Sequence, residues 1–244
     1  MRHSESKVIF ITGASSGIGA AIARKAAAAG HIVVLAARRK SRLDQLAQEI
    51  SESGGRARSH TLDVRSRSDF EKVVQTTIEE FGHIDVLVSN AGVMPLSSLG
   101  ALKVDEWERM IDVNIKGVLY GIAAVLPLME ARQSGQIISV ASIGAHMVVP
   151  SAAVYCATKY AVWAISDGLR QESDTLRVTT VSPGVVDTEL ADSITDEAAR
   201  AGMESFRAIA LKPEAIANAV LYALDQPADV DVSEIIVRPT ASQV

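Results

Sequence analysis

The residues Thr12–Gly19, which read TGASSGIG, decide how the chain begins to fold. They follow the apolar run VIFI at residues 8–11 and lead into AAIARKAAAAG, a segment rich in helix-forming alanine. Glycines at three of these positions permit a tight strand-to-helix turn, and their lack of side chains lets a ligand approach the backbone. Because N–H groups at a helix N-terminus attract anions, we predict a phosphate-binding turn. The residues expected to form it are Gly13, Ser15, Ser16, Gly17, Ile18 and Gly19.

Apolar, β-branched runs alternate with helix-length segments along the rest of the chain. After residues 8–11, strands are expected at residues 32–37, 57–63, 84–89, 136–141, 178–182 and 234–237. Apolar residues recur at helical spacing in residues 18–29, 43–50, 70–81 and 107–129. Strands joined through helices pair in parallel by right-handed crossovers. We therefore predict an α/β fold, a doubly wound parallel seven-stranded sheet of Rossmann type with helices on both faces, which makes the glycine turn a dinucleotide-binding site.

The chain is expected to form one domain, residues 1–244. Within it, residues 5–182 would hold the dinucleotide and the reacting groups, residues 183–212 a substrate loop, and residues 213–244 the last helix and strand. The part of the loop at residues 187–206 is rich in Asp, Glu, Ser and Ala. It suits a lid over the site, and a solvated loop with a short helix remains the alternative.

Composition limits the class of function. A net charge of −5 argues against a general nucleic-acid binder. Hydrophobic residues make up 48% of the chain and charged residues 22%, which is typical of a soluble protein, and polar residues interrupt every apolar run, so no membrane span is expected. The single cysteine excludes an internal disulfide, and the first residues, MRHSESKVIF, lack the apolar segment of a secretory signal. We expect a cytoplasmic protein.

The end of the second predicted strand indicates which coenzyme is bound. An NAD-binding chain usually presents Asp or Glu there for the ribose 2′-hydroxyl, whereas this chain has Arg38 and Arg39. Guanidinium groups accept a 2′-phosphate through charge-assisted hydrogen bonds. NADP(H) is therefore the expected cofactor, with Arg38 the better candidate because it comes first after the strand. A solvated basic loop is the alternative.

Residues 154–162, VYCATKYAV, contain the candidate reactive groups. Tyr155 and Lys159 are four residues apart in a segment of helical character, so both project from one face. Cys156 points away from that face and has no histidine nearby in sequence to activate it, so we interpret it as a packing residue. The five histidines match no metal-ligand spacing, and no metal site is expected.

Five separate motifs, in order, resemble those of the short-chain dehydrogenase/reductase family over Val8 to about Val237. They are TGASSGIG, Asn90-Ala91-Gly92 after a strand, Asn114 on a long helix, Ser142 at a strand end, and Tyr155 with Lys159. The family commonly has asparagine where this chain has Ser89, which affects only local hydrogen bonding. The resemblance implies an Asn-Ser-Tyr-Lys catalytic set at Asn114, Ser142, Tyr155 and Lys159, and a homotetramer or homodimer.

The resemblance also implies the remaining coenzyme contacts. Asp63 and Val64 would contact the adenine, although Asp63 could simply cap a turn. Asn90, Ala91 and Gly92 would lie near the adenosine half, and Tyr155 and Lys159 would also contact the coenzyme. Pro183, Gly184 and Val185 would contact the nicotinamide, with Thr188 reaching its carboxamide. Asn114 would hold a water in a proton relay through Lys159.

Elementary chemistry explains why such residue types would be needed. Reducing a ketone delivers a hydride to carbon and a proton to oxygen, so the site needs a proton donor that can be reset near neutral pH. A free tyrosine has a pKa near 10, and bringing it to about 7 needs roughly 4 kcal/mol of preference for tyrosinate. The Lys159 ammonium and the positive charge of the oxidised coenzyme are expected to supply this. Ser142 would hydrogen-bond the substrate oxygen.

The expected substrate pocket is mostly apolar and small. We predict that Met94, Ser142, Gly144, Ala145, His146, Val148, Val149, Tyr155, Val185 and residues 187–206 line it. This favours an enzyme that interconverts a small ketone and a secondary alcohol, close to the branch that acts on small hydroxy acids, hydroxy amino acids and ketones.

Two other functions are considered. A 3-oxoacyl-carrier-protein reductase usually ends in a glycine-rich segment, and this chain ends VRPTASQV. A non-catalytic NADP-sensing regulator would be expected to have lost Tyr155 or Lys159, and both are present.

The segment 107–129 is apolar on more than one side. One stripe carries Ile111, Ile115, Val118, Ile122, Val125 and Met129, while Gly117, Gly121 and Ala124 lie on other faces. Such a helix is covered twice, either by the sheet and a second subunit or entirely within one chain.

Overall fold

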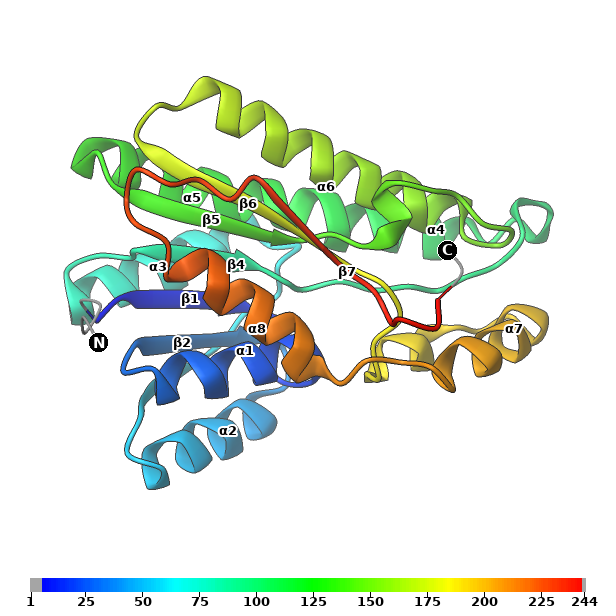
Figure 1. Cartoon of the computed structure of the whole chain (residues 1–244), viewed down its shortest axis with the longest axis horizontal. Helices are drawn as coiled ribbons and strands as arrows, with labels where there is room; N and C mark the ends of the chain where they lie inside the picture. The colour runs from blue at the N-terminus through cyan, green and yellow to red at the C-terminus, as the bar shows by residue number, and fades with distance from the viewer. Residues whose placement is uncertain (1–5, 243–244) are drawn as a thin grey trace.

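Seven parallel strands form a single sheet in the computed structural model, which describes residues 6–242 apart from the side chains of residues 204 and 205 (Figure 1). The remaining positions of the expected 1–244 domain, and those two positions of the expected loop, lie outside what is described. The strand order is β3-β2-β1-β4-β5-β6-β7. The strands are β1 (Val8–Thr12), β2 (Ile32–Ala37), β3 (Arg56–Thr61), β4 (Val86–Ser89), β5 (Gly135–Val140), β6 (Leu176–Pro183) and β7 (Glu234–Val237). The predicted fold class is confirmed.

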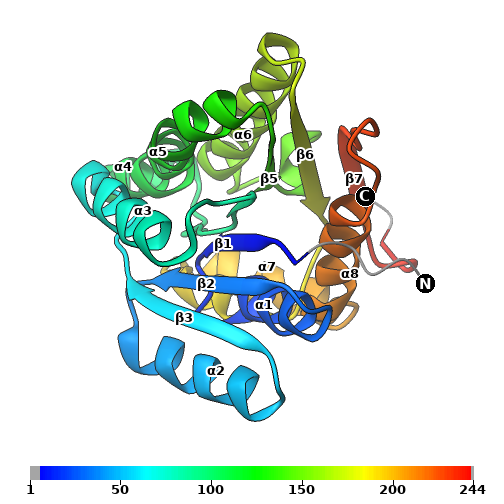
Figure 2. The same cartoon turned by 90° about the vertical axis from the view of Figure 1, so that its left-hand side faces the viewer.

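Helices cover both faces of this sheet (Figure 2). On one face lie α1 (Gly17–Ala28), α2 (Lys40–Glu52) and α8 (Pro213–Leu224). On the other lie α3 (Arg67–Phe81), α4 (Val104–Met110), α5 (Gly117–Arg132) and α6 (Ala153–Glu172). Each face has its own apolar core, and the central strands are buried on both sides, as their continuous apolar runs require.

The segment predicted as one helix over residues 107–129 is interrupted. It consists of α4, a π-helical turn at Ile111–Lys116, and α5. Asn114 lies in the π-helical turn and is buried. The predicted helix is therefore present as part of the longer helix Val104–Arg132, and the apolar spacing fails to reveal only the local change in hydrogen-bond register.

The small residues of α5 serve packing within the chain. A side chain at Gly117 would collide with Val64, and one at Gly121 would press against Phe70 and Leu87. The helix is thus covered by α3 and the sheet on these faces. Ile111, Leu119 and Leu128 remain exposed on its outer side.

By length and composition alone, Val104–Arg132 could span a bilayer, with a mean hydropathy of 1.5 in its most apolar window. This departs from the expectation that no stretch comes near that limit. Packing explains part of its apolar content, since Val118, Ile122, Val125 and Met129 are buried in the core, although only 39% of this window is buried in the chain.

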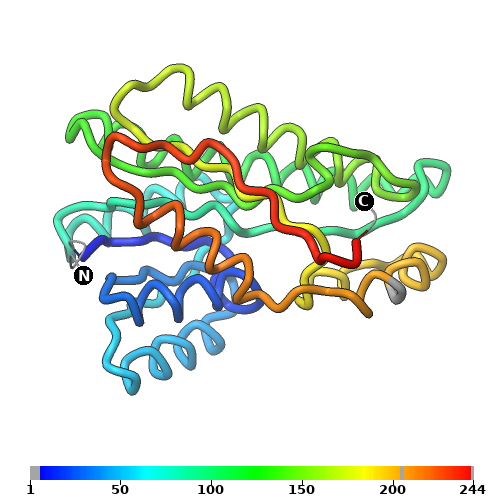
Figure 3. Tube along the Cα trace, in the orientation of Figure 1, coloured from blue at the N-terminus to red at the C-terminus, as the bar shows by residue number. Residues whose placement is uncertain are grey.

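The expected substrate loop extends beyond the carboxyl ends of the strands, as the trace in Figure 3 shows. It contains a 3₁₀ turn at Glu189–Ser193 and the helix α7 (Glu197–Arg207). A backbone bridge between Val186 and Leu211 closes its base. The segment is thus a folded excursion that includes a helix, one of the two forms expected from its composition.

Candidate active site

A cavity of about 490 Å³ lies at the carboxyl ends of the strands, where β1 and β4 are neighbours and the strand order reverses. Open α/β sheets bind their ligands at this point. Gly13, Ser15, Gly17 and Arg38 line one part of the cavity, and the candidate reactive groups line another. The fold therefore brings the glycine turn and the YxxxK pair to a single site.

Two polar side chains hold the glycine turn in shape. The Asn90 amide donates to the Thr12 carbonyl oxygen at 2.8 Å, and Thr12 Oγ1 accepts from the backbone N–H of Asn90 and of Ala91. Gly13 and Gly17 have φ angles of 66° and 53°, in the left-handed region that favours glycine. Asn90 and Ala91 thus support the turn from behind, in addition to lining the cavity.

The start of α1 is suited to an anion. The first turn contains no acidic residue, and the Ser16 side chain at the N-cap makes no hydrogen bond to the helix. The first N–H groups of a helix have no partner within it, and they carry the positive end of its dipole. These groups fit the pyrophosphate of a dinucleotide.

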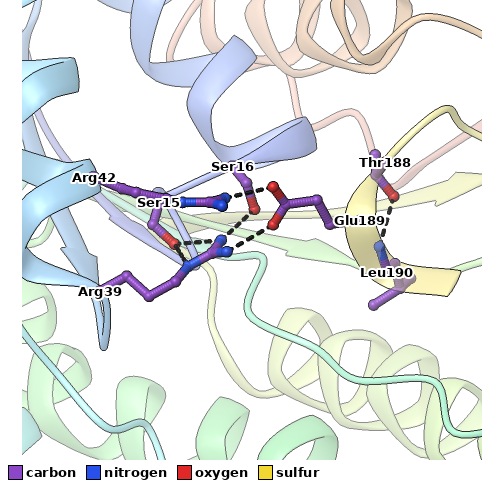
Figure 4. A network of polar contacts seen from close by, with 7 residues as sticks. All are labelled: Ser15, Ser16, Arg39, Arg42, Thr188, Glu189 and Leu190. Atoms are coloured by element: carbon purple, nitrogen blue, oxygen red, sulfur yellow. Dashed lines mark hydrogen bonds and ion pairs between the residues drawn. The ribbon is translucent and has the colours of Figure 1, made fainter. Parts of the chain in front are cut away.

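The two arginines after β2 differ in their contacts. Arg38 is exposed at the cavity and makes no hydrogen bond or ion pair with any described residue. Arg39 donates to Ser15 and Ser16 and forms an ion pair with Glu189 (Figure 4). A phosphorylated ribose fits here, because Arg38 is an unpaired cation and Ser15 and Ser16 add hydroxyl groups.

Asp63 and Val64 line the same cavity, beside Leu62. Arg65 forms a 2.6 Å ion pair with Asp63, and its hydrogen bonds lower the pKa of that carboxyl against the opposing effect of burial. Asp63 is therefore an ionised acceptor that already has a partner, and an adenine amino group would share it with Arg65.

Tyr155 and Ser142 form the centre of the reactive end. Ser142 follows β5, and its Oγ accepts the backbone N–H of Gly144 at 3.0 Å. Tyr155 lies on α6 and is buried. Burial raises the pKa of Tyr155 to about 12, while a hydrogen bond with Ser142 acts in the opposite direction and the Cys156 thiol adds to the rise. The phenol is therefore protonated at neutral pH.

Lys159 lies one helical turn further along α6. Its Nζ donates to the Val140 carbonyl oxygen at 2.9 Å and lies 5.9 Å from the centre of the Tyr155 ring. Burial lowers the pKa of Lys159 to about 8. Among the protein side chains, the desolvation of the phenol outweighs the effect of its neighbours. The expected lowering of the tyrosine pKa toward 7 by Lys159 together with the oxidised coenzyme stays a prediction.

Asn114 connects three parts of the site. Its Oδ1 accepts from Val93 N at 2.9 Å, and its Nδ2 donates to Val93 O and to Thr158 Oγ1, each at 3.0 Å. A methyl group at Gly92 would lie 3.5 Å from Asn114 Oδ1 and 3.8 Å from Lys159 Nζ. Asn114 thus fixes the loop after β4 against α6. Asn114 Oδ1 and Lys159 Nζ both border the small space beside Gly92.

Most of the predicted pocket wall faces the cavity. Met94, Ser142, Gly144, Val149, Tyr155 and Val185 line it, and so do Pro183, Gly184 and Thr188. His146 does not, because its Nε2 contacts Glu234 Oε1 at 2.8 Å and Ser182 Oγ at 3.2 Å. Ala145 and Val148 are also outside the set of lining residues, the first buried and the second exposed.

Several lining residues were missed in the sequence. Leu96, Arg109, Met147 and Ala152 line the cavity and were not predicted to do so. The predicted segment 187–206 contributes Met203 and Phe206 from α7, although neither was singled out. The last two are three residues apart in α7, the spacing of one helix face, and that signal could have singled them out within the loop. Cys156 borders the cavity too, but burial raises the pKa of its thiol, which fits a packing role.

The chain matches the family model of the short chain dehydrogenases over residues 7–199, and it belongs to the short-chain dehydrogenase/reductase family. It is 45% identical, over the full length of both chains, to an uncharacterized oxidoreductase of Staphylococcus saprophyticus. It is an oxidoreductase of this family.

Solved structures agree with this assignment. An alcohol dehydrogenase from Thermococcus sibiricus complexed with 5-hydroxy-NADP is 34% identical, with a TM-score of 0.89 and coverage of 98% of this chain and 99% of that one. A serine dehydrogenase complexed with NADP+ is 33% identical, with a TM-score of 0.87 and coverage of 94% of each chain. A family member from Burkholderia phymatum in complex with NAD is 25% identical, with a TM-score of 0.88 and coverage of 97% and 90%.

Proposed function

We propose that this protein is an NADP(H)-dependent oxidoreductase that interconverts a small ketone and a secondary alcohol, with Tyr155 as general acid and base. The observation that carries the proposal is a single cavity that joins an unpaired Arg38 and the glycine turn to the Ser142, Tyr155 and Lys159 group. When bound, the coenzyme supplies the hydride. The protein's own residues then have to orient the carbonyl and move one proton.

In the reducing direction, negative charge develops on the carbonyl oxygen as the carbon accepts the hydride. The protonated phenol of Tyr155 donates its proton to this oxygen, which gives the alcohol. Ser142, already hydrogen-bonded to Tyr155, shares the developing negative charge through its hydroxyl. The Lys159 ammonium is positioned by its hydrogen bond to the Val140 carbonyl oxygen. Its positive charge stabilises the tyrosinate that forms when Tyr155 loses its proton. Asn114 and Lys159 border the space beside Gly92, through which the proton of Tyr155 would be replaced from solvent.

The proposed substrate is small and largely apolar around its carbonyl. Met94, Val149, Met203 and Phe206 contribute apolar surface to the cavity. The similarity to an alcohol dehydrogenase and to a serine dehydrogenase supports simple secondary alcohols or hydroxy acids as the substrate class.

The preference for NADP(H) rests on Arg38 and on the absence of a carboxylate at the end of β2. The NADP complexes of two similar proteins support it, and the NAD complex of a third makes a direct test necessary.

The test is a panel of ketones and secondary alcohols, followed by nicotinamide absorbance with each coenzyme. We expect turnover of at least one small ketone, faster with NADPH than with NADH. A faster reaction with NADH throughout would contradict the coenzyme assignment, and no turnover with any member would contradict the enzymatic one.

We further propose a homo-oligomer, a tetramer or dimer, located in the cytoplasm. Leu119 on α5 and Tyr160 and Trp163 on α6 are large apolar side chains exposed to solvent in the single chain. Cys156 is a free thiol, which suits a reducing compartment.

A further inference from the structure

Glu189 joins the substrate loop to the coenzyme end of the cavity (Figure 4). Its Oε2 accepts from Arg39 Nη1 at 2.7 Å, and its other oxygen is paired with Arg42 Nη1. Arg39 follows β2 and Arg42 lies in α2, whereas Glu189 opens the 3₁₀ turn of the loop. The contact therefore links segments about 150 residues apart in the chain.

Four of the five N–H donors of Arg39 are used in this arrangement. Its Nε and Nη2 donate to Ser15, its Nη2 also to Ser16, and its Nη1 to Glu189. Arg42 has Glu189 as its partner among the described residues. One loop carboxylate thus neutralises part of the positive charge beside the pyrophosphate turn and Arg38.

A ribose 2′-phosphate bound at Arg38 would also draw on the donors of the adjacent Arg39. It would carry between one and two negative charges at neutral pH and would repel a carboxylate held on Arg39. Hydrogen bonds from Arg39 and then from Arg42 lower the pKa of Glu189, so this carboxylate is ionised at neutral pH. A coenzyme without that phosphate makes no such demand on Arg39.

Resting on the proposed function, we propose that Glu189 is a coenzyme-selectivity residue, a loop carboxylate that occupies the Arg39 and Arg42 cations and that the 2′-phosphate of NADP(H) has to displace. NAD(H) leaves the Glu189 ion pairs intact. Glu189 therefore reduces the difference in affinity by which the arginines favour NADP(H) over NAD(H). Binding of NADP(H) breaks the ion pairs of Glu189 with Arg39 and Arg42, which link the substrate loop to the coenzyme end of the cavity.

The test compares the dissociation constants of NADPH and NADH, measured by coenzyme fluorescence, in the wild-type protein and in Glu189→Gln. The side chain of Glu189 is 45% exposed, so the amide is accommodated without repacking. Exposed ion pairs are weak, and we expect NADPH to bind about two- to fivefold more tightly in the variant, with NADH unchanged.

The matched control is Asp192→Asn. Asp192 lies in the same 3₁₀ turn and pairs with Arg207 at 2.8 Å instead of with Arg39, so its loss should leave both dissociation constants unchanged. Unchanged or weaker NADPH binding in Glu189→Gln, or equal changes for both coenzymes, would overturn the proposal. If the wild-type protein bound NADPH no more tightly than NADH, the result would contradict the proposed preference for NADP(H), and the role of Glu189 that rests on it.

Discussion

Tyr155 and Lys159 are buried side by side, and burial moves their pKa values toward each other, to about 12 and about 8. Both shifts favour the neutral form of the side chain. A neutral phenol is the form that donates a proton during carbonyl reduction. Alcohol oxidation needs the tyrosinate, so we expect it to depend on additional positive charge near the phenol and to be favoured at higher pH.

Replacing Lys159 by methionine should stabilise the protein while removing activity. The folded pKa of about 8 lies below the ordinary value of 10.5, which corresponds to a cost of about 3 kcal/mol for the buried ammonium at pH 7. The variant also loses the hydrogen bond to the Val140 carbonyl oxygen, which lowers its free energy of unfolding by about 1 kcal/mol. We expect Lys159→Met to raise the free energy of unfolding at pH 7 by about 2 kcal/mol, measured by urea denaturation.

The pH dependence of the free energy of unfolding shows whether burial of the Lys159 ammonium causes this difference. Between pH 8 and 10.5 the unfolded chain binds more protons at Lys159 than the folded one, so this residue makes the wild type more stable as pH rises through that window. The difference between Lys159→Met and wild type should shrink there. A variant that is less stable than wild type at pH 7, with no narrowing, would show that burial of the ammonium is not costly.

At this scale, sequence spacing predicted that Tyr155 and Lys159 share a helix face, and the family resemblance implied that Ser142 lies near them. It could not predict that Lys159 bonds to Val140, because that contact depends on how α6 lies on β5. The order of residues after the strand singled out Arg38, but the sequence could not show that Arg39 is paired, because its partner Glu189 is remote in sequence.

Among the elements, the turn between β1 and α1 tolerates the least change. A methyl group at Gly19 would lie 2.5 Å from the Gly13 carbonyl oxygen and 2.6 Å from Asn90 Nδ2. Backbone has to move to admit it, which would misplace the N–H groups at the start of α1.

We therefore expect Gly19→Ala to lower the free energy of unfolding by about 1–3 kcal/mol and to weaken coenzyme binding at least tenfold. Gly168→Ala in α6 is the matched control, because a methyl group there meets nothing within 4 Å and alanine favours a helix by about 0.5–1 kcal/mol. Urea denaturation and coenzyme fluorescence measure the two effects. Tight coenzyme binding by Gly19→Ala would show that the turn can be reshaped without loss of the site.

The predicted strands agree with β1 to β7 within a few residues. The five central strands are buried and mostly apolar, whereas the partly exposed edge strands β3 and β7 were expected from shorter runs. The π-helical turn around Asn114 escaped prediction, since residues on both sides keep helical spacing. Loop helix α7 was also only an alternative, because residues 187–206 have a composition that suits a solvated loop as well as a helix.

For the whole molecule, alternation of strands and helices was enough to predict the class of fold. The neighbour relation of β1 and β4, which opens the cavity, follows from the doubly wound topology. The apolar outer faces of α5 and α6 are not explained within one chain, and they support the proposed oligomer.

Leu119→Glu tests that proposal. Leu119 is 42% exposed in the single chain, so the change should leave the monomer folded but place a charge in an interface on α5. We expect light scattering after size exclusion to show an oligomer for wild type and a smaller species for the variant. A monomeric wild type would contradict the proposed assembly.

The central claim, that Tyr155 passes a proton to the substrate oxygen, is tested most directly by the turnover number of Tyr155→Phe with NADPH and the best ketone of the panel. Tyr160→Phe is the control, because Tyr160 lies on the same helix and is exposed. We predict a fall of about 10²- to 10⁴-fold for Tyr155→Phe with NADPH binding retained, and no fall for Tyr160→Phe. A Tyr155→Phe enzyme that keeps most of its turnover number would contradict the claim.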